Sequence, residues 1–348
     1  MAVRLTSLFG RLSLLIALLL PSIFSKAQEI VGEEVVLRYE SPHPYQGSRA
    51  DGEMVWSQTI RYTEKDASYV ALHFSDTKIG RNDQLIVKSP DGTRAWSYSS
   101  EEINAKNNTF WSIPIYGNTV IVEIHAFNSG GDFGYVIDKI ARGFTQTELN
   151  LRDGGPESIC GDDDSQEAMC YATSEPAVYE RGRAVARLWL NGTINCTGYL
   201  LGSEGHLMTC NHCIGNANEA ANTTVEMMAE GPDCMTDCRM LGACPGTIEA
   251  TSVTMVQTSC NLDYSLVQLP TNITPTYGFL QMRGTGPALG EQIYIVGHPA
   301  GWGKRVSFDS DSPQDAPEGV AHIHTLTENS CWCEGAANRV GYFEDTRG

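Results

Sequence analysis

The chain has 348 residues, and its 42 acidic side chains outnumber its 24 lysines and arginines, which gives a formal net charge of −18 at pH 7. Nucleic-acid phosphates repel so acidic a chain, and the composition therefore argues against nucleic acid as a partner. No apolar stretch reaches the roughly 20 residues of a transmembrane helix, so we expect no membrane partner once the N-terminal leader is removed.

Residues 1–27 have the features of a secretory signal peptide. Arg4 and Arg11 give a positive start, Leu12–Leu20 form a short apolar core, and Ser25–Ala27 offer a small-x-small cleavage site. The segment carries three basic residues and no acidic one, so its removal makes the mature chain more acidic still. We predict a secreted, extracellular protein, in which the 11 cysteines form disulfides by default.

Residues 28–148 contain no cysteine and show the alternating apolar pattern of β-strands. In the first clear segment, Val70, Leu72 and Phe74 lie on one face. Strands are predicted at 69–74, 83–88, 119–125 and 135–137, separated by turn-forming residues. About 120 residues of such segments suit one β-sandwich. We expect an accessory domain or a pro-domain, with a glycan or a protein as a possible partner.

Residues 149–182 are turn-rich and acidic, which predicts a linker. Cys160 and Cys170 bracket its acidic run. They either close a short loop on each other or pair with the domain that follows, and the spacing leaves both options open. From residue 183 onward short strands resume, and we place the second domain at 183–348.

The most informative segment of the second domain ends at His212. An apolar stretch, Cys196–Leu201, and a turn, Gly202–Gly205, lead into Met208–Cys213, which predicts two strands joined by a tight turn. A disulfide between Cys196 and Cys213 would hold His212 at the mouth of this hairpin. A general base needs such a fixed position, but a histidine beside a structural disulfide is the simpler alternative.

Three segments resemble the chymotrypsin-like serine proteases. Met208–Cys213 is similar to their catalytic-histidine segment, Cys260–Pro270 to their aspartate strand, and Ile295–Gly301 to a Gly-His-Pro-x-Gly loop. The residues before the histidine are more like those of the secreted microbial branch that includes the lysyl-endopeptidase-like and glutamyl-endopeptidase-like enzymes. The resemblance covers roughly residues 180–348. It implies a double β-barrel and peptide-bond hydrolysis of a protein or peptide substrate.

The resemblance also implies roles for two residues. His212 would be the general base, and Asp263 would accept its Nδ1 proton and so set the tautomer. The third member of the triad is missing, because no Gly-x-Ser-Gly stands in the right context. The stretch Gly341–Gly348 is similar to the one that precedes the nucleophile in this group. We therefore expect the serine just beyond Gly348 and a second barrel that is incomplete within the printed sequence.

The printed chain is accordingly expected to be inactive as it stands. The odd number of cysteines agrees with a missing C-terminal partner. Two accounts remain open: a fragment of a serine endopeptidase, and a degenerate homologue that is a non-catalytic secreted binding protein.

The remaining cysteines raise the question of a metal site. Cys234, Cys238 and Cys244 lie in an insertion, and with Cys210, His212 and Cys213 nearby a zinc site is the rival interpretation. Their spacing is irregular, unlike the paired Cys-x2-Cys knuckles of zinc sites. We predict structural disulfides there. Cys331 and Cys333 are interpreted as members of two separate bridges, and no metal or cofactor is expected. Glycosylation sequons, each of the form Asn-x-Thr, mark Asn107, Asn191, Asn222 and Asn272 as surface candidates.

Overall fold

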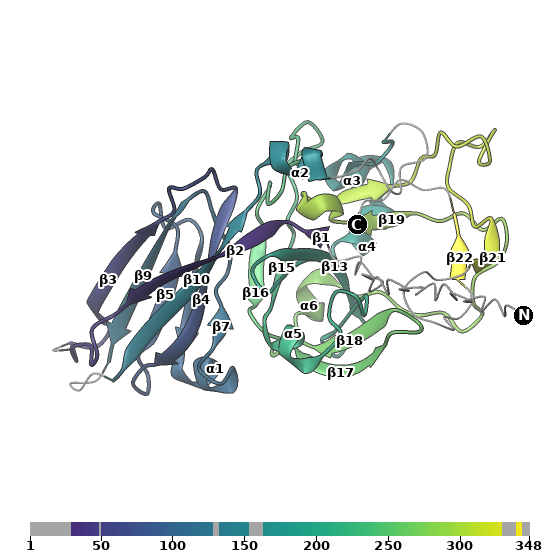
Figure 1. Cartoon of the computed structure of the whole chain (residues 1–348). Helices are drawn as coiled ribbons and strands as arrows, with labels where there is room; N and C mark the ends of the chain where they lie inside the picture. Colours follow the sequence, from purple (N-terminus) through teal and green to yellow (C-terminus); the bar gives the residue numbers. More distant parts are fainter. Residues whose placement is uncertain (1–28, 49, 128–131, 153–162, 329–338, 343–348) are drawn as a thin grey trace, which may run out of the picture.

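The computed structural model describes residues 29–48, 50–127, 132–152, 163–328 and 339–342. Figure 1 shows a flat two-layered region on the left and a curled sheet beside it, with a less regular region on the right. The predicted all-β class is confirmed, because strands build both regions and the helices are short. The predicted leader, Cys160, Cys331 and Cys333 lie outside the described residues.

The two-layered region is the predicted β-sandwich, made of two antiparallel sheets. The first sheet has the order β2 (Gly32–Glu40), β10 (Gly134–Gly143), β4 (Tyr69–Lys78) and β7 (Phe110–Trp111), with β8 (Ile115–Tyr116) also paired to β4. The second has the order β3 (Glu53–Arg61), β9 (Thr119–Ala126), β5 (Gln84–Lys88) and β6 (Ala95–Ser99). A short helix, α1 (Ser100–Ala105), follows β6, and its first turn is capped by the Ser99 hydroxyl, which accepts from the Glu102 N–H.

The core of the sandwich follows from the alternation in the sequence. Val70, Leu72 and Phe74 of β4 are buried in one hydrophobic cluster, together with the alternate residues of β9 from the opposite sheet. Because successive strand residues point to opposite faces, each layer contributes every second side chain to this core. The predicted shared face of Val70, Leu72 and Phe74 is confirmed.

The curled sheet contains the segment that ends at His212. Its strand order is β16 (Thr247–Ala250), β15 (Thr223–Met227), β12 (Val185–Leu190), β13 (Ile194–Leu201), β14 (His206–Thr209), β18 (Tyr264–Gln268) and β17 (Thr254–Ser259). The first short strand, β1 (Glu29–Ile30), also pairs with β13. Leu188, Leu200 and Leu207 of this sheet belong to a second hydrophobic cluster of buried residues.

The predicted hairpin is present in this sheet. β13 and β14 pair antiparallel, with Tyr199 opposite Met208. The turn uses Gly202 at φ 66° and Gly205 at φ 79°, a backbone region that glycine enters without steric cost. The glycines were therefore reliable markers of this turn.

The remaining elements lie around and beyond the curled sheet. A three-stranded sheet has the order β11 (Gln166–Glu167), β20 (Arg305–Ser307) and β19 (Ile295–Gly297), and β21 (Thr325–Glu328) pairs with β22 (Arg339–Gly341). The helices are α2 (Gln146–Arg152), η1 (Ala168–Cys170), α3 (Tyr171–Ser174), α4 (Pro176–Gly182), α5 (Ala217–Ala221), α6 (Thr274–Tyr277) and η2 (Pro299–Gly301). Among the described residues, none of these helices has the length and apolar character to cross a membrane.

The sandwich and the curled sheet are packed against each other. A third hydrophobic cluster draws Tyr69 and Trp111 from the sandwich and Trp189 and Leu241 from the second region. The Tyr69 hydroxyl donates to the Gly192 carbonyl across the boundary at 2.8 Å. The contact therefore has a buried core of its own.

Candidate active site

The register of two neighbouring strands brings His212 and Asp263 together. β14 and β18 pair antiparallel, with Thr209 opposite Ser265. His212 lies in the turn that follows β14, and Asp263 lies in the turn that precedes β18. Antiparallel pairing places the end of one strand beside the start of the other. Residues 51 positions apart in sequence therefore meet at one edge of the sheet.

The two side chains make a two-point contact. His212 Nδ1 lies 2.8 Å from Asp263 Oδ2, and the His212 backbone N–H donates to Asp263 Oδ1 at 3.0 Å. Asp263 has φ 51°, a left-handed conformation that Asp adopts more readily than most residues. The side chains retain 16% and 9% of their exposure, so the pair is sheltered but reachable from solvent.

The turn that carries His212 is fastened from several sides. The Asn211 side-chain amide donates to the Thr258 hydroxyl at 2.7 Å, and the Ser265 hydroxyl donates to the Ile214 carbonyl. These bonds tie the histidine turn to β17 and β18. The imidazole is thereby held in one position relative to Asp263.

Cys196 and Cys213 form a disulfide with a Cα–Cα distance of 6.3 Å. Cys213 is buried and belongs to the second hydrophobic cluster. The bridge joins β13 to the residue directly after His212, so it fixes the far end of the histidine turn.

Cys210 is a third member of this neighbourhood. From the sequence it was considered, with His212 and Cys213, only as part of a zinc site that included the insertion cysteines. It carries a thiol. One ligand atom each from Cys210, His212 and Asp263 can be chosen so that all three lie within 4.8 Å of one another. The available signal was the Cys-x-His spacing at the end of a strand.

The Gly-His-Pro-x-Gly loop lies elsewhere and is buried. His298 donates from its backbone N–H to the Thr197 hydroxyl at 2.9 Å, and its Nδ1 lies 3.1 Å from the Trp302 carbonyl oxygen. Burial holds the pKa of His298 well below the usual range, and the nearby Arg187 and Lys304 act in the same direction. This imidazole is therefore neutral.

The cysteines of the insertion are in disulfides. Cys238 pairs with Cys244, and Cys234 pairs with Cys170. Of the two options for Cys170, the structure has the pairing with the second domain. Cys260 is disulfide-bonded as well.

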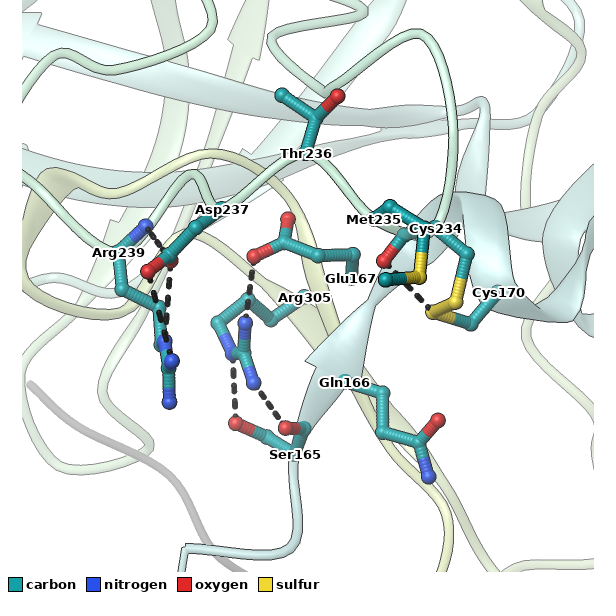
Figure 2. Close-up of a pocket in the computed structure, with 10 residues that line it drawn as sticks. All are labelled: Ser165, Gln166, Glu167, Cys170, Cys234, Met235, Thr236, Asp237, Arg239 and Arg305. Carbon is teal, nitrogen blue, oxygen red and sulfur yellow. Dashed lines mark hydrogen bonds and ion pairs between the residues drawn. A yellow bond between two sulfur atoms is a disulfide. The ribbon is translucent and has the colours of Figure 1, made fainter.

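The Cys170–Cys234 bridge lines a pocket of about 340 Å³ (Figure 2). Arg305 lies in its wall and donates from NH1 to Glu167 Oε1 at 2.7 Å and from Nε to the Ser165 hydroxyl at 2.8 Å. Burial lowers the pKa of Arg305 and raises that of Glu167. The charge of Glu167 partly offsets this by raising the pKa of Arg305, and the charge of Arg305 lowers that of Glu167. The pocket's inner charges are thus paired, and its lining residues are distinct from the His212–Asp263 pair.

The four predicted glycosylation residues occupy different environments. Asn107 and Asn272 are exposed, and Asn191 is partly buried. Asn222 is partly buried and engaged, because its Oδ1 accepts from the Trp111 N–H and its Nδ2 donates to the Asn218 carbonyl. Asn107, Asn191 and Asn222 line one polar cavity of about 530 Å³.

Comparisons with known proteins show which family the chain belongs to. The lysyl endopeptidase C-terminal domain family matches residues 162–339. "Secreted RxLR effector protein 73" of Plasmopara viticola is 35% identical over 301 residues, which cover 82% of this chain and 71% of that protein.

Two similar solved structures are a Glu endopeptidase in complex with MPD and the HtrA-type protease AlgW with a tripeptide. The first is 17% identical, with 52% of this chain and 81% of that chain covered, at a TM-score of 0.31. The second is 16% identical, with 48% of each chain covered, also at 0.31. Likeness at this level carries no information on residue roles. On the family match, which spans half of the chain, the chain belongs to the lysyl endopeptidase family of chymotrypsin-like serine proteases, whose substrates are peptides or proteins.

Proposed function

We propose that this protein is a secreted serine endopeptidase in which His212 is the general base and Asp263 orients it. The observation that carries the proposal is the contact of 2.8 Å between His212 Nδ1 and Asp263 Oδ2, at an edge of the sheet that solvent reaches. A carboxylate on Nδ1 selects the tautomer whose Nε2 has a lone pair for a proton.

In the proposed mechanism His212 Nε2 takes the proton of a serine hydroxyl as that oxygen attacks the peptide carbonyl. The Asp263 carboxylate stabilises the imidazolium that forms, and the imidazolium later returns the proton to the leaving amine. The backbone N–H of His212 donates to the other Asp263 oxygen. This second bond favours the ionised carboxylate and prevents its rotation away from the ring.

No serine of the printed sequence is assigned as nucleophile. The 348-residue polypeptide is therefore expected neither to hydrolyse peptides nor to react with a fluorophosphonate probe. Sequencing the coding region beyond codon 348 tests the source of the nucleophile, and an in-frame Gly-x-Ser-Gly supports the proposal. Histidine-dependent hydrolysis by the 348 residues alone would contradict the assigned roles.

A form that carries the serine tests the base directly. Peptidase activity is measured for the parent and for His212→Ala, with His73→Ala as the matched control. His73 also has a carboxylate on Nδ1, Asp138 at 2.5 Å, but it lies in the sandwich. We expect His212→Ala to abolish turnover and His73→Ala to leave it unchanged. Equal effects of the two variants would refute the assignment.

The second candidate is a non-catalytic secreted binding protein. The observation that favours it is that the Plasmopara viticola relative is named as a secreted effector. An immediate stop after codon 348, combined with an inert purified chain, would support this candidate over the endopeptidase.

We further propose an extracellular location after removal of residues 1–27. The three disulfides among the described residues fit this compartment. The proposed units are an accessory or pro-domain at 28–148, a linker at 149–182 and the protease domain at 183–348. The candidate sequons would carry glycans at the surface, and glycosidase treatment of the secreted protein, followed by mass measurement, tests each of them.

A further inference from the structure

We propose that Cys210, His212 and Asp263 form a binding site for Zn²⁺ or a similar borderline-soft divalent cation, and that the bound metal blocks His212 as a base. The argument for metal binding uses only the positions of the three ligand residues. The inhibitory consequence rests on the proposed function.

The backbone places the three ligands at one edge of the curled sheet. Cys210 directly follows β14, His212 is two residues further in the same turn, and Asp263 comes from the turn before β18. Their ligand atoms can be chosen within 4.8 Å of one another. Tetrahedral zinc with bonds of about 2.0–2.3 Å needs its ligand atoms roughly 3–4 Å apart. Small side-chain rotations are therefore enough to close the site.

The donor set selects the type of metal. A thiolate, an imidazole and a carboxylate are the three side-chain types that bind zinc in proteins. The thiolate disfavours Mg²⁺ and Ca²⁺, which prefer oxygen ligands. All three residues are only partly buried, so water can complete the coordination as the fourth ligand.

The disulfides show which sulfur in this neighbourhood is a thiol. Cys196 and Cys213 lie in the same neighbourhood, but their sulfurs are bonded to each other, whereas Cys210 carries a thiol. This site departs from the sequence-based expectation of no metal, and it uses Asp263 in place of the insertion cysteines. The Cys196–Cys213 bridge also holds the turn in place, which lowers the cost of organising the ligands.

Metal binding and base catalysis compete for the same groups. A proton-accepting imidazole must keep a free lone pair, and Asp263 must remain on Nδ1. Coordination takes an imidazole nitrogen and the carboxylate together. The proposed enzyme would therefore be reversibly inhibited by zinc, and a chelator would restore it.

Cobalt provides the direct test. The purified 348-residue chain is titrated with Co²⁺, and the thiolate-to-cobalt charge-transfer absorption is recorded, followed by displacement with Zn²⁺. We expect one equivalent to bind, the band to disappear on addition of Zn²⁺, and Mg²⁺ to have no effect.

Four variants assign the ligands. Cys210→Ser should abolish the charge-transfer band, and His212→Ala and Asp263→Asn should each weaken binding by at least about tenfold. His73→Ala, which removes the histidine of the sandwich pair, should bind like the parent. Circular dichroism is the control that tests whether each variant is folded.

Two results would overturn the proposal: no charge-transfer band in the folded parent, or a band that persists in Cys210→Ser. The outcome is separable from that of the proposed function. Zinc binding without His212-dependent peptidase activity in any serine-carrying form would refute the endopeptidase and leave the metal site intact.

Discussion

Glu226 and Asp263 are carboxylates of the same curled sheet in opposite surroundings. Glu226 on β15 pairs with Arg187 at 2.9 Å, and neither side chain has any exposure. Asp263 pairs with His212 at the partly exposed edge. Comparing the two separates a charge that holds the structure from a charge that is available for chemistry.

Every acceptor position of Glu226 is occupied. Oε2 accepts from Arg187 and from the Trp189 indole N–H, and Oε1 accepts from Arg94 and from the Gly246 N–H. Burial alone would raise the pKa of Glu226, but the adjacent guanidiniums of Arg187 and Arg94 hold it well below the usual range. The carboxylate is permanently charged and has no capacity for a substrate.

This network also joins the two regions. Arg94 belongs to the sandwich, and so does Tyr116, whose hydroxyl accepts from Arg187 NH2 at 3.1 Å. A buried ion pair gives little net stability relative to apolar residues, but losing one partner is costly. We infer that the network specifies how the sandwich docks on the curled sheet.

The largest expected effect is on catalysis. In a form that carries the nucleophile, Asp263→Asn should lower kcat by roughly 10⁴-fold, because the amide favours the wrong imidazole tautomer. The free energy of unfolding should change much less than that of a fully buried pair, since the site is at a partly exposed edge. A rate within tenfold of the parent enzyme would show that Asp263 does not set the tautomer.

The next effect is on stability. Glu226→Gln leaves the Arg187 guanidinium buried without its counter-charge and should cost about 3–5 kcal/mol in the free energy of unfolding. Asp237→Asn is the matched control, because its ion pair with Arg239 is more than half exposed and should contribute less than about 1 kcal/mol. Urea denaturation measures both, and similar losses would contradict the contrast between buried and exposed pairs.

Removing the bridge beside His212 should cost slightly less. The double substitution Cys196→Ala and Cys213→Ala is expected to lower the free energy of unfolding by about 2–4 kcal/mol, because the unfolded chain regains the entropy of an open loop. The measurement is the shift in denaturation midpoint under non-reducing conditions. An unchanged midpoint would mean that the turn is held by its hydrogen bonds alone.

A smaller, pH-dependent effect is expected at a second contact between the sandwich and the curled-sheet region. Lys106 of the sandwich donates to the carbonyl and the hydroxyl of Thr251. Burial lowers its pKa from 10.5 to about 8, despite the nearby Glu102.

Between the folded-state pKa of about 8 and the ordinary value of 10.5, the unfolded chain binds a proton at Lys106 that the folded chain does not. Stability should therefore rise with pH by about 1.4 kcal/mol per unit across this window. Lys106→Met should remove this slope, as measured by urea midpoints at several alkaline pH values. A parent slope no steeper than that of the variant would refute the lowered pKa.

The local elements could be predicted because their signals are local. Alternation at Val70, Leu72 and Phe74 placed a strand in the sandwich, and Gly202 and Gly205 located the hairpin turn. His212 and Asp263 were chosen as candidates through the resemblance, since each stands in a distinctive segment, and the structure brings the two side chains into contact.

The docking network of Arg187 and Glu226, and the closeness of Cys210 to Asp263, could not be predicted for a different reason. Arg187 and Glu226 sit in strands, where a charged residue normally faces solvent, and their burial depends on the sandwich covering them. The pairing of Cys170 with Cys234 spans 64 residues and has no local signature.

The sequence by itself determined the strands and the turns and singled out His212 and Asp263 as candidates, because backbone periodicity and short motifs are properties of neighbouring residues. Only the tertiary structure decided which charges are buried, which cysteines pair, and that a thiol lies beside the imidazole. Those outcomes depend on contacts between residues far apart in the chain, and their energies exist only once the sheets have packed.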